Sequence, residues 1–404
     1  MPVTVHIPTA LQKFTGGEQS VELAAPLPSL LDQLAARFPG IAPHLRDKHG
    51  ALRHFLNIYV NDEDIRLLGA AAYQFRDGDD VLLVPSIAGG KPAAREAEVC
   101  VPATSANLGC ALDCGAVAVN RYLRARARQR REPGVTLSYE GVNAERIPPD
   151  KSNLLIQAIQ EIAASRGEEL PGLHVQVESE IPVGAGLGSS AASIVAGLVL
   201  GAQLLGAKHE DDEILSLAAR MEGHPDNVTA AYHGGFTIAL LEKQSSRVLF
   251  AKALMPSDLR LIAIVPDIPL PTKSARAVLP PSYSREDVVH NLQRAVLLAA
   301  ACFSGSFAFQ PELFRDRLHQ PYRSRLIPGL EVCLEVRHPA LLGVFLSGAG
   351  SSVLALVRNE RAEAEVAERL AQGFQRHGLS TQALFLQAEN RGVRELAREG
   401  VWKA

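Results

Sequence analysis

The amino-acid sequence predicts an α+β fold, divided into a small front module and a larger remainder of two lobes. A length of 404 residues is sufficient for two or three domains. Runs with the two-residue periodicity of strands alternate with runs of helical periodicity. A seam at residues 88–97, rich in glycine, proline and small side chains, separates two apolar stretches. We therefore expect a module over residues 1–90, a linker over 91–97, a first lobe over 98–255 and a second lobe over 256–404.

The composition is that of an ordinary globular enzyme, with 47% hydrophobic and 21% charged residues. The net charge of −3 gives no electrostatic reason to expect nucleic acid or a membrane surface as partner. The five cysteines are an odd number and scattered, which favours a reducing compartment over a disulfide framework. The sequence has neither a signal-peptide pattern nor an apolar stretch of ~20 residues. We expect a cytoplasmic protein.

The front module has the element order ββαββ. Alternating apolar residues at 3–7 and 21–23, with a turn at 15–17, predict a hairpin. Helical periodicity follows over 29–38, and strand-like runs occupy 55–60 and 81–84. This order within ninety residues, followed by Gly-Gly, resembles the β-grasp fold of ubiquitin-like proteins.

Three segments of this module resemble the MoaD/ThiS sulfur carriers, most closely the mycobacterial-type carrier that supplies sulfur for cysteine synthesis. They are residues 3–9, residues 57–64 and Ala88-Gly89-Gly90. The resemblance implies that the carboxylate of Gly90 is adenylated and converted to a thiocarboxylate. Because Lys91 follows Gly90, the peptide bond between them must first be cut. The expected partners are a zinc protease of the JAMM type, a carrier-activating adenylyltransferase and a sulfur-accepting synthase. Alternatively, Gly89-Gly90 is only a hinge, and the module is a binding or regulatory domain.

The larger module alternates strands and helices. Strand-like runs at 98–101, 117–123, 137–139 and 173–178 precede a long helix that begins near Ser189. The second lobe should contain, in order, a strand at 259–265, a helix at 287–302, a strand at 343–346, a helix at 360–377 and a strand at 380–386. Six arginines between residues 121 and 131 have in part a two-residue period, which favours the solvent face of a strand over a nucleic-acid site.

A glycine-rich segment between a strand and an apolar helix carries the clearest chemical signal. It reads Pro182, Val183, Gly184, Ala185, Gly186, Leu187, Gly188, Ser189, Ser190, Ala191, Ala192. Three glycines allow the backbone to approach an anion, and the start of the following helix adds unpaired N–H groups. The segment therefore predicts a phosphate-binding loop. It has neither the lysine of a Walker loop nor the spacing of a dinucleotide fingerprint.

This loop resembles that of the GHMP kinases, and further segments resemble homoserine kinase. These are residues 102–109, 222–228, 271–276, 320–323 and 347–352. The resemblance extends from about residue 98 to 395. It implies a lobe like domain 2 of ribosomal protein S5, followed by a ferredoxin-like lobe. The implied reaction is the ATP-dependent phosphorylation of L-homoserine, in the threonine and methionine branch of amino-acid biosynthesis.

The resemblance also implies roles for individual residues. The expected catalytic residues are Asp113, Asp226, Asn227 and Thr272, with Thr272 beside the transferring phosphoryl group. The expected substrate-binding residues are Asn107, Asp113, His224, Asp226, Arg276, Arg323 and Gly348. Among these, the two arginines would bind the carboxylate, because guanidinium geometry suits bidentate pairing.

ATP would be bound by residues 182–192, and Asn153 would touch adenine unless it only begins a helix. Ser190 and Glu222 would hold Mg²⁺, with Glu213 as the reserve carboxylate.

Besides the alternative for the front module, two further alternatives remain open for the kinase. The segment Cys110-Ala111-Leu112 departs from the Pro-Gly-Phe usual in the family, which permits another small hydroxylated amino acid, such as serine or threonine, as substrate. The kinase lobes could also form a non-catalytic scaffold. The sequence does not determine the oligomeric state, for which a homodimer is one option.

Overall fold

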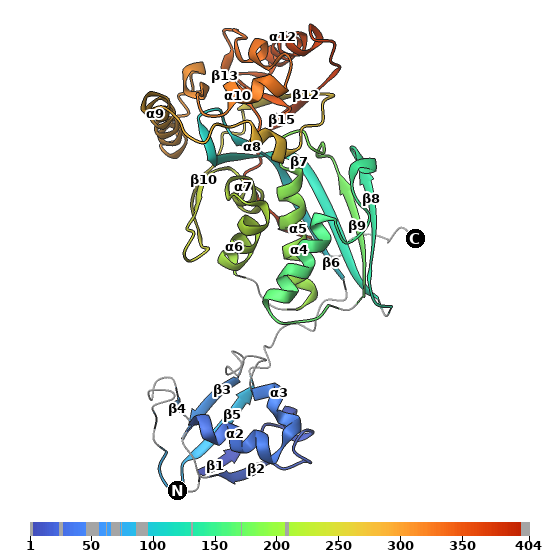
Figure 1. The fold of residues 1–404 in the computed structure, drawn as a ribbon, viewed down its shortest axis with the longest axis vertical. Helices are drawn as coiled ribbons and strands as arrows, with labels where there is room; N and C mark the ends of the chain where they lie inside the picture. Colours follow the sequence, from blue (N-terminus) through green and yellow to red (C-terminus); the bar gives the residue numbers. More distant parts are fainter. Residues whose placement is uncertain are drawn as a thin grey trace. The chain divides into compact units, whose positions relative to one another are not determined.

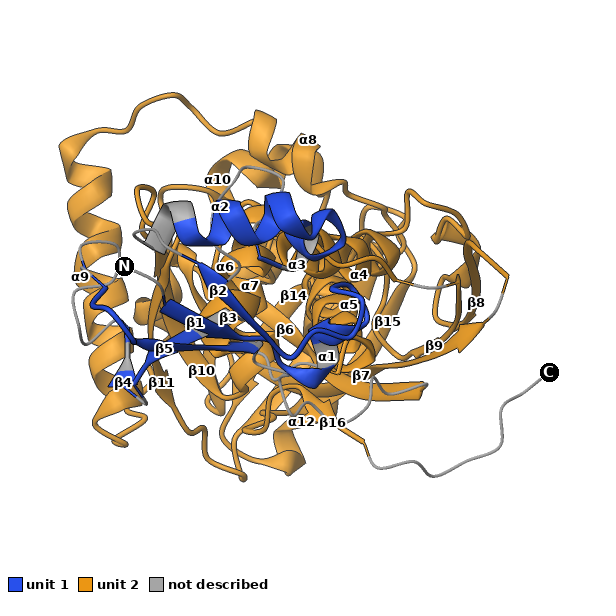
Figure 2. Ribbon diagram, turned by 90° about the horizontal axis from the view of Figure 1, so that it is seen from below, with its two compact units in different colours: residues 1–91 blue, residues 92–404 orange. Residues whose placement is uncertain are grey.

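The computed structural model describes residues 3–23, 27–45, 56–61, 63–65, 73, 75–85, 96–130, 132–170, 172–206 and 210–396. The chain forms two compact units, Met1–Lys91 and Pro92–Ala404 (Figure 2). The expected carrier terminus, Gly89-Gly90, and most of the expected linker lie outside the described residues. Among the described helices, none is long and apolar enough to cross a membrane.

The first unit is a five-stranded sheet with the strand order β2-β1-β5-β3-β4. Its strands are β1 (Val3–His6), β2 (Ser20–Leu23), β3 (Leu56–Val60), β4 (Glu63–Asp64) and β5 (Asp80–Pro85). Its helices are α1 (Thr9–Gln12), α2 (Leu27–Arg37) and α3 (Ala42–Leu45). Strands β1 and β5 pair in parallel, and the other pairs are antiparallel.

Alternating residues of these strands form the core of the first unit together with one face of α2. Val3 and Val5 are buried against Leu30 and Leu34, whereas Glu22 on β2 is exposed. This is the predicted β-grasp arrangement, and the hairpin of β1 and β2 is confirmed. The short elements α1, α3 and β4 were not predicted, because four-residue helices and a two-residue strand are too short to establish a period.

The first lobe of the second unit is built on a seven-stranded sheet (Figure 1). Its strands are β6 (Glu96–Asn107), β7 (Ala111–Arg130), β8 (Val135–Gly141), β9 (Gly172–Ser179), β10 (Phe236–Leu241), β11 (Val248–Ala253) and β16 (Arg394–Glu395). Helices α4 (Leu154–Ser165), α5 (Ser189–Leu204), α6 (Asp211–Glu222) and α7 (Asp226–His233) cover one face of this sheet.

The long strands β6 and β7 reach much further than the expected runs at 98–101 and 117–123. Residues 102–107 are small or polar and resemble a loop in sequence, but helices α5 and α7 pack over them and bury them. A strand covered on both faces does not need to alternate, so periodicity could not reveal it. On β7 the expected solvent face of arginines is confirmed: Leu123, Ala125 and Ala127 are buried, and Arg126 pairs with Glu98.

The second lobe has a four-stranded antiparallel sheet in the order β13-β14-β12-β15. Its strands are β12 (Arg260–Pro266), β13 (Leu341–Leu346), β14 (Val353–Val357) and β15 (Thr381–Gln387). Its helices include α8 (Thr272–Ala277), α9 (Arg285–Phe303), α10 (Gln320–Arg323), α11 (Leu330–Leu334) and α12 (Glu363–Gln375). The order β12-α9-β13-β14-α12-β15 is the ferredoxin-like one that the resemblance implied, but β14 was not among the strands expected from the sequence pattern.

The chain then returns to the first lobe, which the expected division at residue 256 did not include. After β15, the strand β16 pairs with β6, and Arg394 lies opposite Cys100. This two-residue strand is too short to be detected by its pattern. The sheet of the first lobe therefore contains both the first and the last strand that the structure describes in the second unit.

Candidate active site

A cavity between the two lobes of the second unit contains most of the predicted site residues. The side of the first lobe is lined by Asn107, Asp113, Gly184, Gly186, Gly188, Ser189, Ser190, Glu222, His224, Asp226 and Asn227. The side of the second lobe is lined by Leu270, Thr272, Arg276, Arg323, Gly348, Ala349 and Gly350. Segments that are far apart in sequence thus meet at one place.

The glycine loop needs its glycines for two separate reasons. Gly184, Gly186 and Gly188 all have positive φ angles, which other residues adopt only with strain. A Cβ at Gly188 would lie 2.0 Å from Thr104 Oγ1, and one at Gly186 would lie 2.2 Å from the Ser347 carbonyl oxygen. The loop leads directly into α5, a helix of 16 residues, whose first two residues, Ser189 and Ser190, line the cavity. The first N–H groups of a helix have no partner within it. This arrangement is suited to a phosphate group.

The loop 347–352 of the second lobe closes against the glycine loop. Ser347 Oγ donates to the carbonyl of Gly186 at 2.7 Å, and the Ser352 N–H donates to the carbonyl of Ala185 at 3.1 Å. The Gly348 N–H donates to the carbonyl of Ala106 on β6 at 3.0 Å. These contacts fix one wall of the cavity relative to the other.

The turn between β6 and β7 presents two predicted substrate residues. Asn107 and Asp113 both have positive φ, and Asn107 Oδ1 accepts the N–H of Asp113 at 2.9 Å. Asn107 Nδ2 in turn donates to the Gly348 carbonyl at 2.8 Å. Strained non-glycine backbone of this kind is often found at functional sites.

Two arginines reach the cavity from the second lobe. Arg276 on α8 forms a bidentate pair with Asp113, at 2.7 and 3.0 Å. Burial alone would raise the pKa of Asp113. The hydrogen bonds and the charge of Arg276 outweigh burial, so the pKa of Asp113 lies below its ordinary value. Arg323 on α10 is 1% exposed and donates to the carbonyls of Ala275 and Gly348. An arginine buried at the wall of a cavity is well placed to bind an anionic group.

A buried triplet of polar residues lies at the start of α7. Asp226 Oδ1 is hydrogen-bonded to His224 Nδ1 and accepts the N–H of Asn227 at 2.6 Å. Asn227 Oδ1 accepts from Thr104 Oγ1 at 2.7 Å. Burial lowers the pKa of His224, but the hydrogen bond and charge of Asp226 outweigh it, so that the net shift is upward.

Two oxygen ligands for a cation meet at the start of α5. Ser190 Oγ donates to Glu222 Oε2 at 2.5 Å, and burial raises the pKa of Glu222. A hydroxyl and a carboxylate are the oxygen donors that Mg²⁺ prefers, so the donor set fits this ion. Asp113, His224 and Asp226 also place ligand atoms within 4.8 Å of one another. Because Arg276 engages both oxygens of Asp113, this second group is less suited to a cation.

Not every predicted residue lies at the cavity. Asn153 caps α4: its side chain accepts the N–H of Leu155 and donates to the carbonyl of Pro148, as in the helix-start alternative. Glu213 pairs with Arg166 and is not among the lining residues. The lining also omits Pro182, Val183, Ala185, Leu187, Ala191 and Ala192, several of which belong to the hydrophobic core.

Sequence reasoning also missed functional neighbours. Leu270, Ala349 and Gly350 line the cavity, and His319 contacts Arg323 directly. For His319, the available signal was its position immediately before the segment 320–323.

The Asp226 contact gives a pH-dependent prediction. Replacing Asp226 with asparagine removes the charge that raises the pKa of His224, while burial continues to lower it. His224 should therefore lose its proton at a lower pH in Asp226→Asn than in the wild type. An NMR titration of the imidazole signals measures this, with His224→Gln to assign the resonance and the other histidines as internal controls. An unchanged or higher midpoint for His224 would contradict the conclusion that Asp226 raises its pKa.

Comparison with known proteins gives a consistent result. The chain matches the model of the ThiS family over residues 5–90, the GHMP kinases N terminal domain over 153–235 and the GHMP kinases C terminal domain over 298–376. It is 41% identical over 299 residues to a homoserine kinase of Solibacter usitatus, covering 74% of this chain and 96% of that protein. A homoserine kinase of Caldanaerobacter subterraneus is 36% identical over 303 residues, covering 74% and 95%.

A solved structure supports the same assignment. The crystal structure of homoserine kinase from Cytophaga hutchinsonii is 27% identical, with a TM-score of 0.66, and the match covers 76% of this chain and 99% of that one. The second unit is therefore a small-molecule kinase, as the sequence predicted. The chain belongs to the homoserine kinases of the GHMP kinase family, and it carries a ThiS-family domain in front of the kinase.

Proposed function

We propose that the second unit transfers the γ-phosphoryl group of ATP to the hydroxyl of L-homoserine, forming O-phospho-L-homoserine. The observation that carries this proposal is a cavity in which two arginines and two aspartates lie beside the glycine loop. An α-amino acid carries an ammonium and a carboxylate close together, so its site must offer both charges at short range. The names of the relatives that are 41% and 36% identical favour homoserine as this amino acid.

The nucleotide would bind at the glycine loop. The N–H groups at the start of α5 and the close backbone of Gly186 and Gly188 would bind the phosphates. Ser190 and Glu222 would hold Mg²⁺, which neutralises charge on the phosphates when it is bound. Asn153 caps α4 and does not line the cavity, so its contact with adenine is a prediction from the family alone.

The substrate would bind deeper in the cavity. Arg276 and Arg323 would bind the carboxylate, while Asn107, Asp113 and the pair of His224 and Asp226 would bind the amino and hydroxyl groups. Thr272, exposed at the start of α8, would lie beside the transferring phosphoryl group. We infer catalysis by positioning and by charge stabilisation more than by a dedicated base.

The altered segment Cys110-Ala111-Leu112 does not argue against homoserine. Cys110 and Ala111 are 3% and 2% exposed, and neither lines the cavity. The Cys110 carbonyl accepts from Asn291 on the side of the second lobe. The departure thus changes the packing behind the turn, and the side chains expected to touch substrate are retained.

The glycine loop gives the first functional prediction. Gly188→Val should raise the KM for ATP at least tenfold, about 1.4 kcal/mol, because the new side chain collides with Thr104 and blocks the phosphates. Steady-state kinetics measures the change. Gly167→Val is the matched control, because Gly167 also has a positive φ but has nothing within 4 Å of an added Cβ. Unchanged ATP kinetics in a folded Gly188→Val protein would refute the nucleotide assignment.

The two arginines give the second functional prediction and the principal test of the proposed reaction. Arg276→Ala and Arg323→Ala should each lower kcat/KM for homoserine by about 2–5 kcal/mol, at least ~30-fold, with little effect on the KM for ATP. Arg317→Ala is the control, because Arg317 pairs with Glu286 at the surface and lies outside the cavity. If both cavity variants use homoserine normally, the carboxylate site lies elsewhere.

For the first unit we propose a sulfur carrier whose Gly90 becomes a thiocarboxylate after cleavage. The β-grasp sheet and the ThiS-family match support a carrier-like module, and only residues 86–89 separate the end of β5 from Gly90. Cleavage would free the carboxylate, ATP would adenylate it, and a sulfur donor would displace AMP. O-phosphohomoserine is a carbon electrophile and the thiocarboxylate a sulfide donor. On a separate synthase, the thiocarboxylate sulfur would displace phosphate from the terminal carbon of O-phosphohomoserine to form a thioester. Water would then cleave the acyl–sulfur bond, releasing homocysteine and restoring the Gly90 carboxylate.

Release of the carrier is directly measurable. Cells that make this chain together with a JAMM-type protease should yield a species that ends at Gly90, and activation should exchange one oxygen for sulfur, ~16 Da. Gly90→Pro should prevent release, because proline restricts the backbone at the bond to be cut. Intact mass spectrometry gives the readout. A chain that always remains 404 residues long would favour the binding or regulatory alternative.

A further inference from the structure

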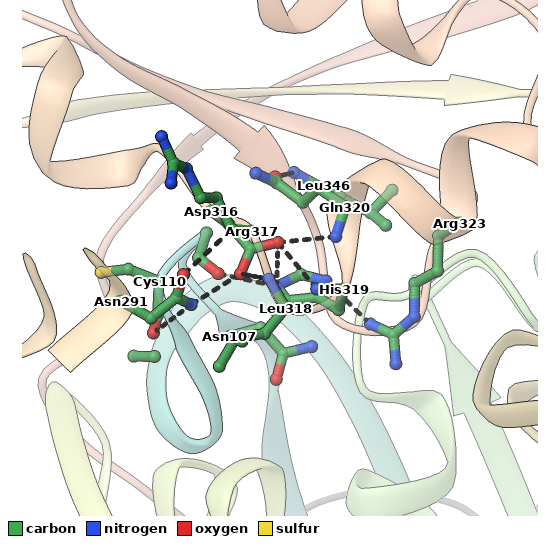
Figure 3. A network of polar contacts seen from close by, with 12 residues as sticks. Asn107, Cys110, Asn291, Asp316, Arg317, Leu318, His319, Gln320, Arg323 and Leu346 are labelled. Carbon is green, nitrogen blue, oxygen red and sulfur yellow. Dashed lines mark hydrogen bonds and ion pairs between the residues drawn. The ribbon is translucent and has the colours of Figure 1, made fainter. Parts of the chain in front are cut away.

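A buried polar network lies behind Arg323 and is not accounted for by the roles given above (Figure 3). Its centre is Asp316, whose carboxylate accepts the N–H groups of Leu318, His319 and Gln320 at 2.6–2.9 Å. The same carboxylate accepts from Asn291 Nδ2 on α9 at 2.7 Å. These bonds fix the backbone immediately before α10, which carries Arg323.

His319 in this network is completely buried, and both its ring nitrogens are hydrogen-bonded. Nε2 lies 2.7 Å from the carbonyl oxygen of Gly109, and Nδ1 lies 3.1 Å from Nη1 of Arg323. A carbonyl can only accept, so Nε2 must carry the proton; a guanidinium can only donate, so Nδ1 must be the acceptor. The two partners therefore define a neutral imidazole with its proton on Nε2.

The surrounding charges agree with this neutral form. Burial lowers the pKa of His319, and the nearby charge of Arg323 lowers it further. Asp316, 3.8 Å away, and Asp113 on β7 act in the opposite direction, but the net shift is downward. A proton on Nδ1 would also point at an N–H group of Arg323, which would break their contact.

The hydrogen bonds of Arg323 show what this contact determines. Its Nε donates to the Ala275 carbonyl at 3.1 Å, and Nη1 donates both to Gly348 and to His319. Three of the five N–H donors are thus engaged, and within the described part of the chain Nη2 has no hydrogen-bond partner. Because Arg323 lines the cavity, Nη2 is the group left for a ligand.

We infer that His319 is a positioning residue that sets substrate affinity, because it orients Arg323 so that Nη2 is available to the substrate carboxylate. This inference rests on the proposed function. His319 touches no ligand itself; it acts as an acceptor at a fixed place. The imidazole of His319 also bonds to Gly109, in the turn that carries Asn107 and Asp113. It therefore connects Arg323 to the residues proposed to bind the amino and hydroxyl groups of the substrate.

Two substitutions separate this role from general packing. Asparagine can place an oxygen near the position of Nδ1 and accept from Arg323, but it cannot reach Gly109. Glutamine can place an amide nitrogen near the position of Nε2 and donate to Gly109, but it leaves Arg323 without its acceptor. Both shorten or alter the same buried ring, so a purely structural role would affect the two variants alike.

The experiment measures KM and kcat for homoserine and KM for ATP in the full chain. We expect His319→Gln to raise the KM for homoserine at least tenfold, His319→Asn to stay within about threefold, and the KM for ATP to remain unchanged in both. In an Arg323→Ala background, neither substitution should raise the KM for homoserine further. The comparison in the Arg323→Ala background remains decisive even if one of the His319 variants is less stable.

Equal KM values for homoserine in the two variants, or a further loss in the Arg323→Ala background, would overturn the inference. These outcomes differ from a failure of the proposed function. In that case the wild-type chain itself would not phosphorylate homoserine, whatever the residue at position 319.

Discussion

The site depends on one constraint: the loop 347–352 of the second lobe must remain in hydrogen-bonding contact with the glycine loop of the first. The Ser347 hydroxyl reaches the Gly186 carbonyl, and the Gly348 carbonyl accepts from both Asn107 and Arg323. Such contacts require two backbones to approach within a few ångströms, which is why a side chain at Gly186 would collide with Ser347. A shift of this loop would remove a hydrogen-bond partner from the glycine loop, from Asn107 and from Arg323 together, and so would affect both the proposed phosphate site and the proposed substrate site.

The charges in the cavity follow from this closure. Asp113 and Arg276 come from different lobes and form a bidentate pair, in which each partly exposed side chain stabilises the charge of the other. A zwitterionic amino acid carries the same two charges and can exchange partners with this pair. A neutral alcohol would have to enter without compensating either charge. We therefore propose that the site selects an amino acid on electrostatic grounds, and that the positioning of Arg323 by His319 sharpens this selectivity.

Local patterns in the sequence predicted the fold well, while contacts between distant segments largely had to come from the structure. Glycine spacing predicted the turn before the helix that begins at Ser189, and alternation predicted the strands of the β-grasp sheet. The full length of β6 escaped detection because burial on both faces removes alternation. The return of β16 was too short to show a pattern. The capping contacts of Asn153 and the contact of His319 with Arg323 depend on three-dimensional neighbours, which spacing alone does not encode.

The most direct test of the account compares L-homoserine with 3-amino-1-propanol, which keeps the amine and the hydroxyl but lacks the carboxylate. The full chain would be incubated with ATP, Mg²⁺ and each alcohol, and phosphorylated product would be measured by mass spectrometry. The account predicts turnover of homoserine and at least ~30-fold lower kcat/KM for the analogue, the cost of leaving the buried Arg323 and the partly exposed Arg276 without their anion. Equal use of the two alcohols would contradict it, because the arginines at the cavity would then have no part in recognising the substrate.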